Sequence, residues 1–237
     1  MTGPSTTGKA DAFCVLFIKP HTPTPHQMIE IPLGIMYLSA CLKTAFGHRV
    51  RTELLDLRMC DDPQRELQSC LERTKPRLIG ISMQVFEQSF LKICVDMLTS
   101  FSPEAHIIVG GPYATTHYDD FLQDRRIGAA VIGEGENVLI NIVGRMLDGR
   151  DYDNLKGIAR NNGTEILRNE PEPYIENLDA LPFPDYDLIN LEHYWRDHIS
   201  MNMVLADRKY VQIISSRACP YHCAYCHNMF GKKLRQR

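Results

Sequence analysis

Residues 107–112 read Ile-Ile-Val-Gly-Gly-Pro, and residues 129–136 read Ala-Ala-Val-Ile-Gly-Glu-Gly-Glu. In both stretches a short, wholly apolar run opens directly into glycines. A strand that is apolar on both faces is typical of a parallel sheet with helices on each side. Glycine at the end of a strand allows a ligand to approach the backbone, although tight turns and helix packing use the same residue. The two stretches predict a buried sheet with a candidate binding edge.

The rest of the first 150 residues repeats this alternation of strand and helix. Further buried strands are expected at 13–18, 50–57 and 78–83, and helical periodicity covers 33–46, 64–73, 90–101 and 138–147. Five such units predict a doubly wound α/β domain of the Rossmann-like type over residues 12–150.

The remaining segments have different compositions. Residues 1–11 are expected to be a flexible leader. Residues 151–208 contain a hairpin turn, Asn-Asn-Gly-Thr at 161–164, and then a proline-rich linker. Residues 209–237 are expected to begin a second unit, with a strand at 210–214 that opens into a cluster of cysteines.

The composition excludes several classes of protein. With 44% hydrophobic and 23% charged residues, the chain is an ordinary globular sequence. The longest apolar run, 12–18, is far shorter than the ~20 residues that span a bilayer, and the polar N-terminus has no signal-peptide core. A net charge of −3 gives no reason to expect a nucleic-acid partner. We therefore expect a soluble cytoplasmic protein that binds neither membranes nor nucleic acid.

Three of the eight cysteines lie close together near the end of the chain. Cys219, Cys223 and Cys226 have C-x3-C-x2-C spacing, so their thiolates can converge on one metal centre. A cubane 4Fe-4S cluster normally takes four cysteines, and three would leave one iron open to a small molecule. The other five are scattered through apolar segments and are expected to be small buried residues: Cys14, Cys41, Cys60, Cys70 and Cys94.

Other uses of the cysteine cluster remain open. His222 or His227 could complete a zinc site, although structural zinc sites usually have a second, distant ligand pair. Residues 223–227 also fit the C-x-x-C-H pattern of c-type haem attachment, which would leave Cys219 unused. The three thiols could also be purely structural. The iron–sulfur interpretation uses all three cysteines and is preferred.

The cysteine spacing, with Tyr225 just before the last cysteine, resembles the signature of the radical S-adenosylmethionine superfamily. That resemblance implies a loop after the first strand of a partial (β/α) barrel. It further implies that Cys219, Cys223 and Cys226 hold a 4Fe-4S cluster whose open iron chelates S-adenosylmethionine, with Tyr225 beside the adenine. One-electron reduction would then yield methionine and a 5′-deoxyadenosyl radical.

The order of motifs is similar to one class within that superfamily, whose N-terminal domain binds cobalamin. The similarity covers nearly the whole chain and rests on residues 31–34, 110–112, 133–136 and 177–184. It implies a serine contact to the cofactor near Ser82 and a glycine pair beside its nucleotide tail. The cofactor-binding positions implied in this way are Ser82, Gly110, Gly111, Gly133, Glu134 and Gly135.

One departure concerns the lower cobalt ligand. Many cobalamin domains carry Asp-x-His-x-x-Gly after the first strand, whereas residues 19–26 read Lys-Pro-His-Thr-Pro-Thr-Pro-His. His21 and His26 are candidate substitutes, but loop histidines are more often solvated. We expect no protein histidine on the lower face of a bound cobalamin.

Only eleven residues follow Cys226, whereas a partial barrel needs several more βα units of roughly 30 residues each. The basic run at 232–237 is expected to be the solvated start of a helix. The resemblance thus implies the N-terminal part of a cobalamin-dependent radical enzyme, inactive alone, that methylates a carbon or rearranges a small-molecule substrate with an electron donor. A longer chain or a second polypeptide would complete the barrel, and residues beyond about 190 are expected to be poorly ordered in isolation. The alternative is a cobalamin carrier module without catalysis.

Overall fold

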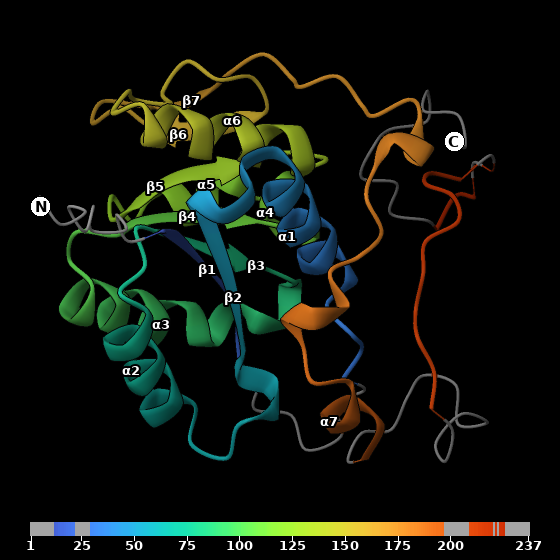
Figure 1. The fold of residues 1–237 in the computed structure, drawn as a ribbon. Coiled ribbons are helices and arrows are strands. Elements are labelled where there is room, and N and C mark those ends of the chain that lie inside the picture. The colour runs from blue at the N-terminus through green and yellow to red at the C-terminus, as the bar shows by residue number, and fades with distance from the viewer. Residues whose placement is uncertain (1–11, 22–28, 197–208, 220, 222, 226–237) are drawn as a thin grey trace, which may run out of the picture.

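The computed structural model describes residues 12–21, 29–196, 209–219, 221 and 223–225. Seven strands form one sheet in the order β2-β1-β3-β4-β5-β6-β7 (Figure 1). The strands are β1 (Phe13–Lys19), β2 (Val50–Asp56), β3 (Leu78–Ser82), β4 (His106–Gly110), β5 (Ile127–Val131), β6 (Ile158–Asn161) and β7 (Ile166–Arg168). The first five are parallel, which confirms the predicted α/β sheet, and β6 and β7 extend it antiparallel.

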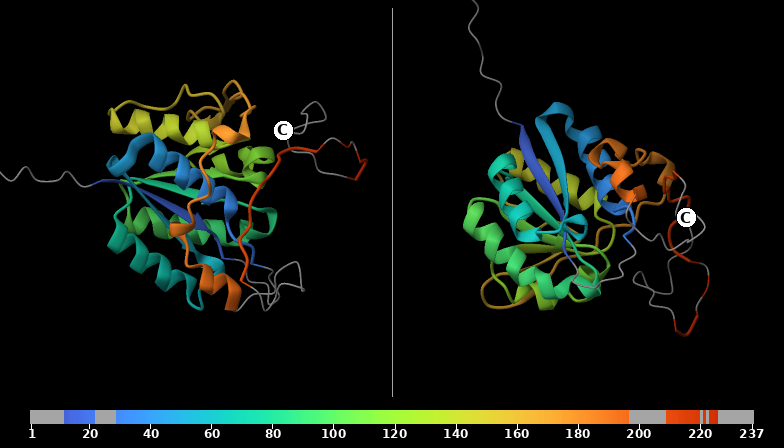
Figure 2. Two further views of the ribbon diagram at one scale, coloured as in Figure 1. Left: turned by 45° about the vertical axis from the view of Figure 1, so that its right-hand side comes forward. Right: turned by 90° about the horizontal axis from the view of Figure 1, so that it is seen from below.

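Helices cover both faces of the sheet (Figures 1 and 2). They are α1 (Leu33–Phe46), α2 (Pro63–Thr74), α3 (Gln88–Phe101), α4 (Pro112–Thr116), α5 (Tyr118–Leu122), α6 (Glu136–Leu147) and α7 (Leu191–Arg196). α1 and α6 share one hydrophobic cluster with the sheet, whereas α2, α3 and α5 share a second cluster on the opposite face. The domain is therefore doubly wound, as predicted.

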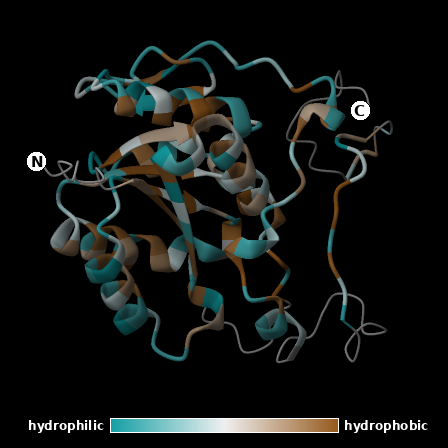
Figure 3. Ribbon diagram, viewed as in Figure 1, coloured by the Kyte–Doolittle hydropathy of each residue, from teal (hydrophilic) through white to brown (hydrophobic). Residues whose placement is uncertain are grey.

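The apolar runs explain this arrangement. All seven residues of β1 are buried, because helices pack against both of its faces. The strands at the centre of the fold are correspondingly hydrophobic, whereas the helices carry polar outer faces (Figure 3). α2 begins where Asp62 accepts a hydrogen bond from the Arg65 backbone N–H at 3.1 Å, with Pro63 in the first turn.

The strand order creates a switch point between β1 and β3. The chain leaves β1 through α1 to reach β2 at one edge, and returns through α2 to β3 on the other side of β1. In open α/β sheets, ligands bind outside the carboxyl ends of the strands at such a point. In this protein those ends are Lys19 and Ser82.

The segment after the sheet agrees only in part with expectation. β6 and β7 form the predicted hairpin. The predicted strand at 210–214 is wrong: these residues have no strand structure, and Val211 and Ile213 are 58% and 64% exposed. No strand in the described ranges pairs with this segment. Two of its carbonyls instead accept side-chain hydrogen bonds, Tyr210 O from Trp195 Nε1 at 2.8 Å and Gln212 O from the Tyr186 hydroxyl at 2.6 Å.

Several predictions concern residues outside the described ranges, namely the leader 1–11, His26, His222, Cys226, His227 and the basic run 232–237. Among the residues that the structure does describe, no helix is both long and apolar enough to cross a membrane.

Candidate functional site

The ends of β3 and β4 are packed closely against each other. Gly111 follows β4 with φ +93°, and a Cβ at this position would lie 2.9 Å from Met83 O and 3.3 Å from Ser82 Oγ. The Met83 N–H donates to Gly110 O at 2.8 Å. Glycine is thus required at 111 by backbone conformation and by close packing. Packing was the alternative that the sequence left open here beside the cofactor role.

A threonine that no sequence motif marked joins these strand ends to β5. The Thr115 hydroxyl donates to Gly111 O at 3.0 Å and accepts from the Gly133 N–H at 3.1 Å. Gly133 has φ +84° and an open surrounding, since the nearest atom to a Cβ there belongs to Tyr174 at 4.0 Å. The predicted positions Ser82, Gly110, Gly111 and Gly133 therefore form one connected edge.

Gly135 has a different role from Gly133. A Cβ at Gly135 would lie 3.2 Å from Leu38 Cδ2 in α1, with ordinary φ. This glycine lets the turn before α6 approach α1, which is the packing role that the sequence left open. The predicted residues of this turn thus divide between the open edge and the helix interface.

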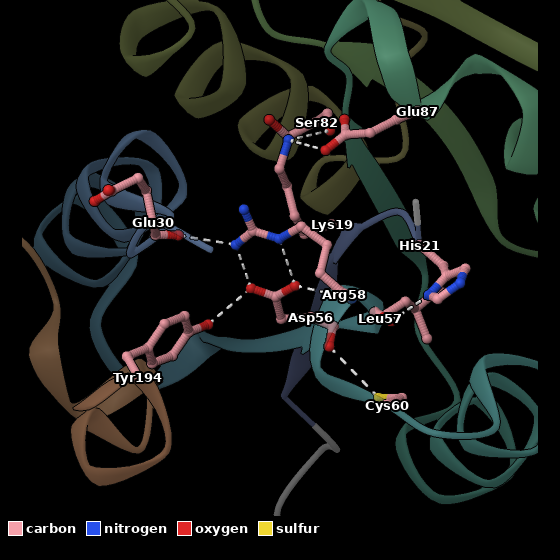
Figure 4. Close-up of polar contacts among 10 residues, drawn as sticks. All are labelled: Lys19, His21, Glu30, Asp56, Leu57, Arg58, Cys60, Ser82, Glu87 and Tyr194. Carbon is pink, nitrogen blue, oxygen red and sulfur yellow. Dashed lines mark hydrogen bonds and ion pairs between the residues drawn. The ribbon is translucent and has the colours of Figure 1, made fainter. Parts of the chain in front are cut away.

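A buried ion pair lies at the switch point, and sequence reasoning missed it. Lys19 Nζ is 2.6 Å from Glu87 Oε1, and the side chains are 5% and 0% exposed (Figure 4). Lys19 also donates to Ser82 O at 3.3 Å, and Glu87 Oε2 accepts from the Gln84 N–H at 2.7 Å. Burial lowers the pKa of Lys19 and raises that of Glu87, and their mutual attraction opposes both shifts. A lysine that ends an apolar strand was the only sequence pattern that pointed here.

His21 follows the end of β1 and contacts Leu57 and Phe90. Its Nδ1 is 3.1 Å from Leu57 O, and its ring meets Phe90 edge-on with centroids 5.7 Å apart. Because a carbonyl oxygen only accepts, Nδ1 carries the hydrogen in this contact. His21 is thus held against the protein by two contacts on the β2 and α3 side.

A second polar network ties the linker to the end of β2 (Figure 4). Asp56 receives hydrogen bonds from Arg58 Nε at 2.8 Å and from the Tyr194 hydroxyl, also at 2.8 Å. Arg58 further donates to Glu30 O at 2.9 Å. The Asp56–Arg58 pair therefore joins three chain segments, because Arg58 contacts the segment before α1 and Asp56 contacts α7.

Glu134, a predicted cofactor contact, faces the chain that leads to the cysteines. Arg217 lies 3.0 Å from Glu134 Oε1 and 2.5 Å from Glu136 Oε1. Glu134 Oε2 also accepts from the Ile175 N–H at 2.8 Å. The turn after β5 is thus joined to both the linker and the cysteine loop.

The described part of the cysteine loop is exposed. Cys219 and Cys223 are exposed free thiols, and Tyr225 is 91% exposed. The described residues alone contain no group of three potential metal ligands, and Cys226 lies outside them. The cluster assignment therefore stays a prediction.

Four of the five scattered cysteines are buried as predicted: Cys14, Cys41, Cys70 and Cys94. Cys60 is half-buried. Burial raises the pKa of every one of these five thiols. They behave as inert packing residues.

Comparison with known proteins identifies the domain. The B12 binding domain family model matches residues 27–143. Over these residues the chain is similar to the B12 binding domain family. The domain contains the strand ends described above, from β3 to β5, and the turn that holds Arg217. The resemblance to cobalamin-dependent radical S-adenosylmethionine proteins is thereby confirmed for its N-terminal component.

Curated relatives align with most of the chain. An uncharacterised methyltransferase of Pyrococcus horikoshii is 24% identical over 207 residues, covering 86% of this chain and 42% of that protein. Anaerobic magnesium-protoporphyrin IX monomethyl ester cyclase of Cereibacter sphaeroides is 27% identical over 209 residues, covering 82% of this chain and 31% of that protein. The chain thus spans less than half the length of these relatives.

Two solved structures share the fold. The radical S-adenosylmethionine methyltransferase TsrM from Kitasatospora setae, with cobalamin and a [4Fe-4S] cluster bound, has a TM-score of 0.62 at 21% identity, covering 91% of this chain and 41% of that one. The cobalamin-dependent radical enzyme OxsB with aqua-cobalamin has a TM-score of 0.65 at 18% identity, covering 78% and 25%. This similarity confirms the Rossmann-like architecture.

Proposed function

We propose that this chain is the N-terminal part of a cobalamin-dependent radical S-adenosylmethionine enzyme. The observation that carries the proposal is a B12-binding domain at 27–143 followed, in the same chain, by cysteines at C-x3-C-x2-C spacing. Neither feature alone distinguishes a radical enzyme from a carrier or a metal-stabilised domain. Together they favour the two-cofactor enzyme over the carrier module.

The carboxyl edge of the sheet fits a cobalamin. We call this edge, formed by Ser82, Gly110, Gly111 and Gly133, the cobalamin edge. β1 and β3 provide the switch point at which such sheets bind ligands. Gly133 leaves the backbone of this edge open, and within the described residues no hydrogen bond engages the Ser82 hydroxyl. In the proposed enzyme, Ser82 orients the cofactor by hydrogen bonding, and the glycines let it approach the backbone.

The donor set of the loop fits an iron–sulfur cluster. Cys219 and Cys223 are free, exposed thiols that can supply thiolate ligands, and Cys226 completes the spacing. Tyr225 is exposed and next in sequence to the third ligand, where it would pack against the adenine. When bound, the two cofactors supply one-electron cleavage of S-adenosylmethionine and methyl transfer or radical rearrangement.

The partners of the whole enzyme belong to the proposal as well. They are a small-molecule substrate and an electron donor that reduces the cluster, in the cytoplasm, without nucleic acid or membrane. The relatives that the chain matches include methyltransferases and a cyclase, which favours methyl transfer or ring-forming radical chemistry. The remaining units of a barrel would supply the substrate cavity.

Titration with hydroxocobalamin tests the first cofactor. The wild-type chain is expected to bind with a shift of the corrin absorbance. A chain with all three loop cysteines replaced by alanine should bind equally, because the proposed cobalamin edge lies in the B12-binding domain. An unshifted spectrum in the wild-type chain would refute the cobalamin part.

Anaerobic reconstitution with iron and sulfide tests the second. The wild-type chain should gain a cluster absorbance that Cys219→Ala, Cys223→Ala and Cys226→Ala each abolish, whereas Cys60→Ala, a control outside the loop, leaves it intact. An unchanged spectrum in the three loop variants would refute the assignment of the iron–sulfur cluster to these cysteines. Zinc in oxygen-free material would point to a metal-stabilised domain, and cobalamin binding without any cluster to a carrier.

A further inference from the structure

The turn between β5 and α6 carries two glutamates that bind the same arginine. Glu134 and Glu136 are almost fully buried, with side chains 6% and 7% exposed, and the side chain of Arg217 is 15% exposed. Burying three charged groups is costly unless they are paired. Their pairing therefore marks a built contact between the B12-binding domain and the chain before Cys219.

Each terminal nitrogen of the Arg217 guanidinium contacts one of the two carboxylates. Arg217 Nη1 contacts Glu134 Oε1 at 3.0 Å, and Nη2 contacts Glu136 Oε1 at 2.5 Å. The Tyr37 ring of α1 lies against the guanidinium, with its centroid 5.6 Å from Arg217 Cζ. Burial opposes the charge, but the hydrogen bonds to Glu136 and Glu134 outweigh it and raise the pKa of Arg217. We call Arg217, Glu134 and Glu136 the arginine latch.

The latch joins parts of the chain that are 81 and 83 residues apart. Arg217 stands two residues before Cys219, and Ala218 between them has φ +66°, a left-handed conformation that is uncommon for alanine. The backbone thus turns sharply directly after the latched arginine. This turn carries the chain from the latch into the exposed cysteine loop.

Glu134 connects the latch to the linker. Its second carboxylate oxygen accepts from the Ile175 N–H, so one side chain holds both the linker and the cysteine segment. Gly135, between the two glutamates, packs against Leu38 and brings the turn close to α1 and Tyr37. Glu134, Gly135 and Glu136 therefore form an interface, whereas Gly133 belongs to the open edge.

We infer that the arginine latch positions the cysteine loop beside the cobalamin edge of the sheet, and so sets the distance between the two cofactors. The inference rests on the proposed function for the identity of the cofactors. Arg217 is a positioning residue: it acts through the loop that follows it and touches neither cofactor. Gly133, at the end of the cobalamin edge, directly precedes Glu134, so one turn serves both sites.

Trypsin tests the latch without any cofactor. It cleaves after arginine only when the side chain enters the protease pocket, and a latched guanidinium is withheld from it. Cleavage between Arg217 and Ala218 should be about tenfold faster in Glu134→Gln/Glu136→Gln than in the wild-type chain. Glu165→Gln, an exposed control, should leave the rate unchanged. Equal cleavage rates in the double variant and the wild type overturn the latch.

The positioning role is tested on the chain loaded with both cofactors. We expect a magnetic interaction between cob(II)alamin and the reduced cluster in the electron paramagnetic resonance spectrum. Arg217→Met should lose or broaden this interaction while both cofactors stay bound, and Arg217→Lys should retain part of it, because lysine keeps the charge but not the two-armed geometry. Arg150→Met removes an exposed ion pair and serves as control.

The outcomes separate the two proposals. If the wild-type chain takes up neither cofactor, the proposed function fails, while the trypsin rates still decide whether Arg217 is latched. If both cofactors bind and the interaction is identical in Arg217→Met, the positioning role is refuted and the proposed function stands. If Arg217→Met fails to fold by circular dichroism, Glu136→Gln is the milder variant for the same comparison.

Discussion

Lys19 Nζ lies 2.6 Å from Glu87 Oε1 at the carboxyl end of β1, with both side chains almost completely removed from solvent. The two residues are brought together by the crossover that places β3 beside β1. Glu87 is additionally held by the Gln84 N–H and Lys19 by Ser82 O, so each charge has a second polar partner. The buried Lys19–Glu87 pair therefore holds the end of β3, at Ser82, within the candidate cobalamin edge.

Removing one member of this pair should destabilise the domain strongly. Glu87→Gln leaves the Lys19 ammonium buried without a counter-charge, and a broken buried pair typically costs about 3–5 kcal/mol. Urea unfolding followed by circular dichroism measures the change in the free energy of unfolding. The double variant Lys19→Met/Glu87→Gln should recover most of the loss, because it buries no charge. A single variant within about 0.5 kcal/mol of the wild type contradicts the pairing.

Tyr194→Phe should lower the free energy of unfolding by about 1.5–3 kcal/mol, the typical net contribution of a hydrogen bond to a charged group. The ring is 4% exposed and stays in place, so only the bond to Asp56 is removed. Tyr221→Phe, whose ring is 71% exposed, is the matched control and should have no effect. The same urea experiment compares them, and equal unfolding midpoints for the two variants would disprove the contribution of Tyr194.

Alanine at Gly111 should cost more than alanine at Gly163, although both positions have positive φ. Gly163 has φ +96° and a Cβ there would have no atom within 4 Å, so its variant suffers only backbone strain of about 1–2 kcal/mol. Gly111→Ala adds a contact of 2.9 Å to Met83 O, which should add a further ~1–3 kcal/mol. Thermal unfolding of both variants measures the difference. A Gly111→Ala protein as stable as Gly163→Ala would show that the strand ends separate readily.

The stability of the domain should fall as the pH rises above about 9, the ordinary pKa of a thiol. Burial raises the pKa of Cys94 to about 12, and that of Cys14 and Cys41 to about 11. In this range the unfolded chain releases thiol protons that the folded chain retains, so each buried thiol contributes a loss of up to about 1.4 kcal/mol per pH unit.

Unfolding in urea between pH 8 and pH 11 checks the sign and the slope of this dependence. Cys94→Val should give a shallower decline than the wild type, because one titrating group is removed. Cys219→Ala, which removes an exposed thiol, should follow the wild type. A stability that rises with pH over this interval would show that the buried thiols do not control it.

The alternating pattern predicted the first five strands and four long helices with small errors at their ends. Runs such as 13–18 are apolar at every position, and such residues have no stable place except the middle of a covered sheet. The hairpin followed from Asn-Gly at 162–163, whose turn conformation is local. Local patterns sufficed for these elements because neighbouring residues determine them.

The expected strand at 210–214 failed for the opposite reason. Four of its five residues are aromatic or β-branched, as is typical of strands, but a strand needs a neighbour to pair with, and no sequence pattern provides one. In the structure, the side chains of Trp195 and Tyr186 donate hydrogen bonds to its carbonyls. The residues that hold the segment lie in the linker and could not be paired with it from the sequence.

The sequence by itself determined the α/β class, the edge formed by Gly110, Gly111 and Gly133, and the spacing of the cysteines, because hydrophobic period and ligand spacing are properties of contiguous residues. Only the tertiary structure decided that Lys19 pairs with Glu87 and that Glu134 and Glu136 hold Arg217. The partners are far apart in the chain, by 83 and 81 residues in the case of Arg217 and its two glutamates. From the sequence, any charged residue of opposite sign was an equally good candidate partner. Only the fold brings these particular charges together in buried surroundings.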